Sequence, residues 1–163
     1  GICNGFQALI KLGLVPYGEI RDISKDDPTL TYNMIGRHQS MLVHTRICSN
    51  VSPWLADCKV SDVHTMPISH GEGRFVCEQQ LLEKLIANGQ VATQYTDLCG
   101  VPTMDQSYNP NGSVMAIESI TSLDGRILGK MGHTERSGDM LYKNVSGINI
   151  QPLFENGVNF FRK

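Results

Sequence analysis

Apolar residues recur at two spacings along the chain, and each spacing predicts one kind of element. Two segments, residues 3–12 and 78–87, place apolar residues every three or four positions, the pattern of a helix with one buried face. Gly13 follows the first segment, and Asn88 and Gly89 follow the second, and such residues commonly end helices. We therefore predict two amphipathic helices in the first 90 residues.

Other segments alternate apolar and polar residues, or form short apolar runs, as β-strands do. Turn residues separate the later segments, with Asn-Pro-Asn-Gly at residues 109–112 and a typical hairpin pair at Asp124 and Gly125. The predicted strands are residues 41–47, 63–68, 90–95, 113–120 and 126–131.

A last amphipathic helix is predicted to begin at Pro152, because proline is favoured in the first turn of a helix. Its inward-facing residues would be Leu153, Phe154, Val158 and Phe161. Helices that alternate with strands, followed by one late hairpin, indicate an α/β fold whose sheet is mixed rather than purely parallel. We expect residues 1–163 to form a single domain.

Composition and charge are those of an ordinary globular domain and exclude several other classes. The 163 residues are 40% hydrophobic and 18% charged, with a formal net charge of -2. The sequence has no basic stripe for nucleic acid, and no apolar run approaches the roughly 20 residues of a membrane helix. We therefore expect neither a nucleic-acid partner nor a membrane partner.

Five cysteines are scattered along the chain without a C-x-x-C pair, which argues against a zinc ribbon and a dithiol redox motif. Such cysteines fit a reducing compartment. We expect a cytoplasmic protein with no metal site. The cysteines are Cys3, Cys48, Cys58, Cys77 and Cys99.

The segment Gly1-Ile2-Cys3-Asn4-Gly5 places a cysteine between two glycines at the start of the first predicted helix. This is the pattern of a nucleophile elbow, in which glycine leaves room for a strained turn around the reactive residue. The helix N-terminus would also favour the thiolate. The alternative is a small buried cysteine in a glycine-rich turn. Because an elbow needs a strand before it, we expect the chain to be a piece of a larger protein.

A nucleophilic cysteine needs a base, and the base needs an orienting group. His133 comes just after the predicted strand 126–131, where a rigid scaffold presents a side chain. Glu135 would share the face of His133 in an extended segment, so it could accept the Nδ1 proton and leave Nε2 toward the thiol. The alternative is a surface His-Glu pair in a loop.

Four segments occur in order along the chain: Gly1-Ile2-Cys3-Asn4-Gly5-Phe6-Gln7, then SHGEGRF at 69–75, NPNGS at 109–113 and GHTER at 132–136. Together they resemble the glutaminase domain of phosphoribosylformylglycinamidine synthase, a glutamine amidotransferase of purine biosynthesis. Residues 52–55 and 141–145 resemble its large single-chain bacterial form. The likeness runs from residue 1 to about residue 161, which is nearly the whole chain.

The resemblance implies a class I glutamine amidotransferase-like (flavodoxin-like) mixed sheet, with helices on both faces and its N-terminal strands missing. It implies that Cys3 attacks glutamine to form a thioester, that His133 is the general base and then acid, and that Glu135 orients it. The ammonia would serve ATP-dependent amidination of formylglycinamide ribonucleotide. The Asn4 N–H would bind the oxyanion; a second donor would come from an upstream loop absent here, so we expect the fragment alone to be poorly active or inert.

The resemblance also implies residues that bind glutamine. Gln7 lies one helical turn past Cys3, where related enzymes contact the substrate; the alternative is a helix residue that caps a neighbouring loop. The loop residues assigned to the amino-acid end of glutamine are His70, Gly71, Glu72 and Arg74, with Asn4 at the reacting carbonyl. The alternative for this loop is a salt bridge between Glu72 and Arg74 at a domain interface.

A few positions have a structural role or depart from the family. Asn111 and Gly112 are expected to form a structural turn rather than a binding site. Gly132 and Thr134 stand where many relatives have proline, and Ser119 stands where glycine is frequent. None of these three departures touches the proposed triad.

The resemblance places ATP and Mg²⁺ in the synthetase portion, so we expect no cofactor on this chain. Its partners would be the substrate glutamine and the synthetase domain of the same parent chain. Two alternatives remain. One is a cysteine peptidase or chaperone-like relative on the same fold, and the other is an inactive truncated module that serves as an interface.

Overall fold

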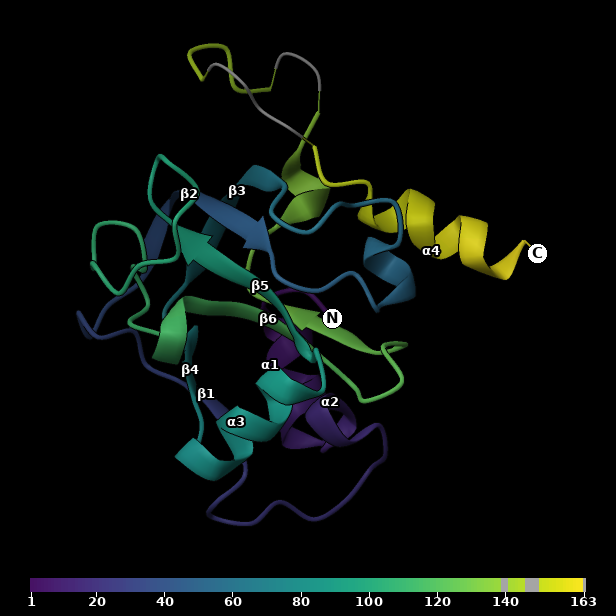
Figure 1. The fold of residues 1–163 in the computed structure, drawn as a ribbon. Coiled ribbons are helices and arrows are strands. Elements are labelled where there is room, and N and C mark those ends of the chain that lie inside the picture. The colour runs from purple at the N-terminus through teal and green to yellow at the C-terminus, as the bar shows by residue number, and fades with distance from the viewer. Residues whose placement is uncertain (139–140, 146–149, 163) are drawn as a thin grey trace.

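The computed structural model of the chain describes residues 1–138, 141–145 and 150–162, and it has a curled sheet flanked by helices (Figure 1). No helix in these residues has the length and apolar character to cross a membrane. The helices are α1 (Asn4–Lys11), α2 (Leu14–Tyr17), α3 (Gln79–Ala87) and α4 (Leu153–Phe161), with 3₁₀ turns η1 (Pro53–Leu55), η2 (Val114–Ala116) and η3 (Thr134–Arg136). The strands are β1 (Thr29–Thr31), β2 (Gln39–Ile47), β3 (Val63–His70), β4 (Arg74–Val76), β5 (Val91–Thr96), β6 (Ile117–Thr121) and β7 (Leu128–Lys130).

Five strands form the central sheet in the order β3-β2-β5-β6-β7, and each neighbouring pair is antiparallel. An isolated parallel bridge joins Ile2 to Lys130 at the end of β7. The sheet is therefore mixed, as the sequence predicted. The bridge also places Cys3 at the edge of the sheet, directly before α1.

Helices cover both faces of the sheet, because successive residues of a strand point to opposite faces. On β5, Val91 packs in one buried cluster with residues of α1, α2 and α3, while Ala92 packs in another with η1 and α4. Figure 1 shows α1, α2 and α3 gathered on one side of the sheet and α4 on the other. The predicted α/β architecture with helices on both faces is confirmed. Buried helix residues of the first cluster are Phe6, Ile10, Val15, Leu82 and Leu85.

Most predicted elements are present. The helices predicted at 3–12 and 78–87 are α1 and α3, and the strands predicted at 41–47, 63–68 and 90–95 are β2, β3 and β5. The strand predicted at 113–120 is wrong at its start, because Met115 and Ala116 have positive φ angles of 48° and 55° within η2. Such a turn cannot continue a strand, so β6 begins only after it.

The last helix begins after Pro152, as predicted, but its buried face differs from the prediction. Leu153 is buried, whereas the three other predicted core residues are 51%, 49% and 74% exposed. These residues are Phe154, Val158 and Phe161. The helix packs on Trp54 through small and polar residues instead. Asn156 donates to the Trp54 carbonyl (3.1 Å), and a Cβ at Gly157 would lie 2.3 Å from the indole, which fills that space.

The sequence pattern did not predict β1 and β4, which form a separate two-stranded sheet with Leu30 opposite Phe75. Each strand has only three residues, too few for a recognisable alternation. Because β4 follows β3 through residues 71–73, this small sheet fixes the return of the loop that the sequence assigned to glutamine binding.

Candidate active site

Cys3 lies at a strained turn between the sheet and α1. Its backbone has φ 52° and ψ -106°, a conformation that residues other than glycine rarely adopt. The Cys3 N–H donates to the Lys130 carbonyl at the end of β7 (2.8 Å), and α1 begins at the next residue. A strained cysteine directly before a helix has the geometry of a nucleophile elbow.

The two glycines of the elbow are not equivalent. A Cβ at Gly1 would lie 2.6 Å from the carbonyl carbon of Gly5, so a side chain does not fit there. A Cβ at Gly5 would meet no atom within 4 Å, since the start of α1 faces open space at that point. The prediction that both flanking positions exclude side chains is therefore right for Gly1 and wrong for Gly5.

The Cys3 thiol faces β3 and donates to the Ser69 carbonyl, 3.7 Å from Sγ. Burial raises the pKa of the thiol; the Asn4 N–H and the Arg136 guanidinium lower it, and the Glu135 carboxylate raises it. The helix start therefore acts in the predicted direction, and burial acts against it. A half-buried thiol of this kind needs a neighbouring base to lose its proton.

His133 lies on the segment after β7 and contacts the same strand. Its N–H donates to the Pro67 carbonyl of β3 (2.8 Å). Its Nδ1 lies 2.5 Å from Glu135 Oε1; because a carboxylate only accepts, Nδ1 carries a proton, and in the tautomer that this contact favours the lone pair is on Nε2. Within the described residues Nε2 is buried without a hydrogen-bond partner. This ring nitrogen is therefore available as a base.

The surface-pair alternative does not describe His133, which is only 7% exposed. Glu135 is the partly exposed member, with 41% of its side chain accessible. Glu135 Oε1 also lies 3.7 Å from Arg136 Nε, so one carboxylate oxygen contacts the imidazole and the guanidinium. These contacts restrain the carboxylate on the imidazole, although one side of it faces solvent.

Strand β3 brings the nucleophile and the base to one place. Cys3 contacts the carbonyl of Ser69, and His133 contacts the carbonyl of Pro67. Alternate residues of a strand are about 6.6 Å apart, and their carbonyls point to the same side. With Glu135 on the imidazole, the predicted nucleophile, base and carboxylate lie together between β7 and β3, the two outer strands of the curled sheet.

The loop after β3 is held from inside by Asn33. Asn33 Nδ2 donates to the His70 carbonyl (2.8 Å), and Asn33 Oδ1 accepts from the Gly73 N–H (3.2 Å). His70 Nδ1 lies 3.1 Å from the same oxygen, and burial lowers the pKa of His70 to about 4. His70 is therefore neutral near pH 7 and packs under the loop, since a Cβ at Gly73 would lie 2.3 Å from its ring.

The other predicted substrate residues lie around this loop. Gln7 Nε2 donates to the Glu72 carbonyl (2.6 Å), so the helix residue holds the loop, which was the alternative to substrate contact. A Cβ at Gly71 would meet no atom within 4 Å. Among the described residues no ion pair joins Glu72 to Arg74, so the salt-bridge alternative is wrong. Contact between glutamine and any of the predicted substrate residues stays a prediction.

Asn111 and Gly112 form the structural turn that the sequence predicted. Asn111 Nδ2 donates to the Gly73 carbonyl (2.7 Å) and to the Tyr95 hydroxyl (2.8 Å). Gly112 has φ 77°, and a Cβ there would lie 2.3 Å from Met34 Sδ. The turn therefore supports the loop at Gly73 and connects it to Tyr95 of β5.

Sequence reasoning missed two buried charged residues beside His133. Glu118 Oε1 accepts from the Gly132 N–H (2.5 Å), and Lys130 Nζ donates to Thr134 Oγ1 (2.6 Å). Both contacts involve the positions where proline was expected from the resemblance. A charged residue inside an otherwise apolar strand was the signal that could have identified them.

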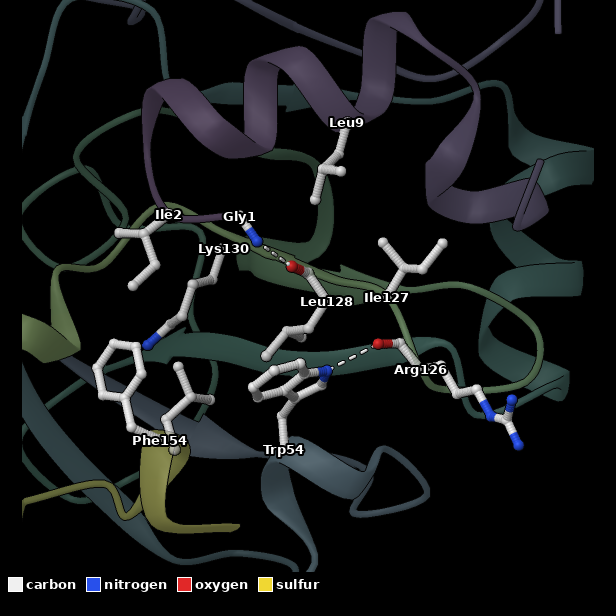
Figure 2. Close-up of a pocket in the computed structure, with 10 residues that line it drawn as sticks. Gly1, Ile2, Leu9, Trp54, Arg126, Ile127, Leu128, Lys130 and Phe154 are labelled. Carbon is white, nitrogen blue, oxygen red and sulfur yellow. Dashed lines mark hydrogen bonds between the residues drawn. The ribbon is translucent and has the colours of Figure 1, made fainter. Parts of the chain in front are cut away.

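An apolar pocket of about 420 Å³ lies beside the elbow but does not contain the triad. Figure 2 shows Gly1 and Trp54 in this pocket, donating to the backbone carbonyls of Leu128 and Arg126 (2.7 Å each). Its lining is mostly apolar, so it offers few groups that would bind the polar substrate of an amidotransferase. The catalytic candidates lie on the other side of the elbow, toward β3.

Named proteins resemble this chain in sequence. It is 38% identical over 148 residues to phosphoribosylformylglycinamidine synthase subunit PurQ of Synechocystis sp., covering 91% of this chain and 60% of that protein. It is 35% identical over 150 residues to the subunit of the same name from Thermomicrobium roseum, covering 92% of this chain and 58% of that protein. The chain thus spans about three fifths of the length of these curated relatives.

A solved structure and a family profile agree with this likeness. The structure of PurLQS from Thermotoga maritima superposes with a TM-score of 0.71 at 24% sequence identity, covering 99% of this chain and 60% of that one. This likeness shows that the two chains share a fold. Residues 1–161 match the profile of the CobB/CobQ-like glutamine amidotransferase domain. The chain therefore belongs to the CobB/CobQ-like glutamine amidotransferase domain family.

Proposed function

We propose that this chain carries the glutamine-hydrolysing site of phosphoribosylformylglycinamidine synthase. The observation that supports this most is that Cys3 and His133 contact carbonyls two residues apart on β3, with Glu135 on the far nitrogen of the imidazole. The names of its relatives support the reaction and the pathway. The site would take the side-chain amide of glutamine as substrate.

The first half of the reaction forms a thioester. His133 Nε2 takes the proton of the Cys3 thiol, and the sulfur attacks the amide carbon of glutamine. The carbonyl oxygen becomes an oxyanion, and the Asn4 N–H at the start of α1 donates to it. His133 then returns its proton to the departing nitrogen, so ammonia leaves and a glutamyl thioester remains on Cys3.

The second half restores the free thiol. A water molecule gives a proton to His133 Nε2 as it attacks the thioester carbonyl. When the tetrahedral intermediate collapses, the carbon–sulfur bond breaks, the sulfur takes the proton from His133, and glutamate is released. Glu135 stabilises the imidazolium in both halves, because its carboxylate accepts from Nδ1–H.

The ammonia has a use only if a synthetase receives it. We infer that the partner is the synthetase that consumes ATP, with Mg²⁺, to amidinate formylglycinamide ribonucleotide. The relatives named PurQ support a synthetase partner in general. Whether synthetase and glutaminase share one chain, as the likeness to the large form implies, stays a prediction.

The proposal is tested by replacing the nucleophile in the complete protein. Cys3→Ala is expected to lower glutamine-dependent product formation by at least about 10⁴-fold while ammonia-dependent formation persists. Cys99→Ala is a matched control, because Cys99 is an exposed free thiol on a loop. Retention of glutamine turnover by Cys3→Ala would overturn the proposal.

The same measurements separate the alternatives. A cysteine peptidase on this fold would cleave an unstructured protein substrate in a Cys3-dependent manner and would leave free glutamine unchanged. An inactive interface module would turn over neither substrate, and a glutamine-analogue chloroketone would not label Cys3. We expect hydrolysis of glutamine to glutamate and labelling at Cys3.

A further inference from the structure

The residues before and after His133 in the sequence each form a hydrogen bond with a buried charged side chain. The Gly132 N–H donates to Glu118 Oε1 (2.5 Å), and Thr134 Oγ1 accepts from Lys130 Nζ (2.6 Å). Glu118 and Lys130 come from β6 and β7, two neighbouring strands of the central sheet. The residue that carries the candidate base is therefore fixed from both sides.

These two charged side chains are buried, which is unusual for glutamate and lysine. Glu118 and Lys130 are each only 1% exposed. Moving a charge out of water is costly unless hydrogen bonds or an opposite charge compensate. In the part of the chain that the structure describes, neither residue forms a salt bridge. Their compensation comes from hydrogen bonds, one from each side chain going to the His133 segment, and from the opposite charge of the other residue. Burial lowers the pKa of Lys130, and the Glu118 carboxylate raises it.

The remaining hydrogen bonds anchor each charged side chain in the core. Glu118 Oε2 accepts from the Thr93 hydroxyl on β5. Lys130 Nζ also donates to Gln151 Oε1 (2.8 Å) and contacts Met66 Sδ of β3 (3.1 Å). Both side chains are thus bound to strands of the sheet as well as to the segment after β7. The position of that segment therefore depends on the positions of these strands.

Residues 132 and 134 suit this arrangement. A Cβ at Gly132 would lie 2.3 Å from Met66 Sδ and 3.0 Å from Glu118 Oε1, so the close approach to Glu118 requires glycine. Glycine alone leaves the backbone free to adopt many conformations. The hydrogen bond from its N–H removes this freedom directly before His133, and the Thr134 hydroxyl does the same directly after it.

Lys130 also contacts the nucleophile. Its backbone carbonyl accepts from the Cys3 N–H (2.8 Å), while its ammonium group binds the residue after His133. Figure 2 shows the Lys130 side chain running from β7 between Ile2 and Phe154, along the wall of the pocket. One residue therefore connects the backbone of the candidate nucleophile with the segment of the candidate base.

We propose that Glu118 and Lys130 are positioning residues that hold His133 in register with Cys3. The proposal rests on the proposed function, because it assigns them to the base of that reaction. Glu118 fixes the peptide before His133, and Lys130 fixes the residue after it and the elbow itself. Neither touches the substrate. Without these hydrogen bonds the imidazole of His133 would shift relative to the Cys3 thiol. A small shift of this kind is enough to slow proton transfer between them.

The test measures glutamine hydrolysis in the complete protein, with kcat calculated per thiol that a glutamine-analogue chloroketone labels. Lys130→Met keeps the length of the side chain and removes the ammonium group; kcat is expected to fall on the order of 10²-fold, with KM changed less than about threefold. Glu118→Met is expected to lower kcat by about 10-fold or more, again with little change in KM. Lys84→Met and Glu83→Met on the exposed face of α3 are matched controls.

A conservative variant distinguishes positioning from general stability. Glu118→Gln keeps an oxygen that accepts from the Gly132 N–H. On a logarithmic scale its kcat is therefore expected to lie at least about halfway from the Glu118→Met value to the wild-type value. If Lys130→Met does not fold, Thr134→Val removes only the hydroxyl that accepts from Lys130, and kcat is expected to fall about 10-fold. A purely structural role would reduce the yield of labelled thiol and leave kcat per labelled thiol unchanged.

The outcomes separate this proposal from the proposed function. If Cys3→Ala and His133→Ala abolish turnover while Lys130→Met, Glu118→Met and Thr134→Val keep the wild-type kcat, the positioning proposal fails and the function stands. If Cys3→Ala retains turnover, the function itself fails. Loss of kcat at unchanged KM in the three positioning variants, with recovery in Glu118→Gln, supports both.

Discussion

The elbow at Cys3 and the segment that carries His133 are positioned by different means. Cys3 is held by its own strained backbone, by a glycine two residues before it and by the helix that follows. His133 is held by side chains from β6 and β7 that lie up to 15 positions away in sequence, at Glu118 and Lys130. The conformation of the elbow is thus set mainly by its own residues, with one backbone hydrogen bond to Lys130, whereas the position of the base depends on side chains from two neighbouring strands.

This difference predicts which changes the site tolerates. We expect the elbow to keep its conformation when residues elsewhere in the core are substituted, as long as its own residues are unchanged. A base held by distant buried charges is sensitive to any change that shifts one strand against another. We expect the His133 segment to fail first when the domain is destabilised.

The largest effect distinguishes the imidazole from its carboxylate partner. His133→Ala is expected to lower kcat for glutamine hydrolysis by about 10⁴-fold or more, because it removes proton transfer in both halves of the reaction. Glu135→Ala should cost no more than this, because Glu135 only orients and stabilises the imidazole. Steady-state kinetics on both variants test the order, and a greater loss in Glu135→Ala would contradict the assigned roles.

A smaller effect compares a glycine from each region. Gly132→Ala places a Cβ 2.3 Å from Met66 Sδ in the core, and overpacking of this kind is expected to lower the free energy of unfolding by about 1–3 kcal/mol. Gly5→Ala meets no atom within 4 Å and lies in α1, so it is expected to raise that free energy by about 0.5–1 kcal/mol.

Urea unfolding of the two alanine variants provides the measurement. Equal destabilisation by both would show that the open space at Gly5 is filled in solution. A Gly132→Ala protein as stable as wild type would show that Met66 moves aside at little cost.

The smallest expected effect concerns the charge of Arg136 beside the elbow. The Arg136 guanidinium lowers the pKa of the Cys3 thiol, so Arg136→Gln raises that pKa and leaves less thiolate at pH 7. Because Arg136 is half exposed, the effect is screened, and labelling of Cys3 by iodoacetamide at pH 7 should slow by about two- to threefold. The two rates should converge at a pH well above the thiol pKa. Faster labelling in Arg136→Gln would contradict the assigned electrostatic role.

Much of this site was predictable from sequence because part of it is local. The elbow is one continuous pentapeptide, and His133 and Glu135 are two residues apart, so both patterns are visible without a fold. Helices with a clear apolar face, α1 and α3, were predicted to within a residue or two of their ends. These features depend on residues that are neighbours along the chain.

What the sequence did not predict depends on packing. The inward face of α4 was wrong because Trp54, about 100 positions earlier, packs its indole against Gly157 and accepts a hydrogen bond from Asn156 at its carbonyl. Glu118 and Lys130 were overlooked because a charged residue in a strand is usually at the surface. The burial of Cys3 against β3, which raises the pKa of its thiol, is a property of the folded sheet and is not visible in the pentapeptide.

The outer position of β3 has a consequence for solubility. An outer strand exposes backbone carbonyls that can pair with another molecule, and natural proteins cover or interrupt such strands. Here Pro67 lacks an N–H, its carbonyl accepts from His133, and the Ser69 carbonyl accepts from Cys3. The residues that would hydrolyse glutamine also shield this strand from intermolecular β-pairing. A change that loosens the segment around His133 should therefore slow glutamine hydrolysis and also make the protein aggregate more readily.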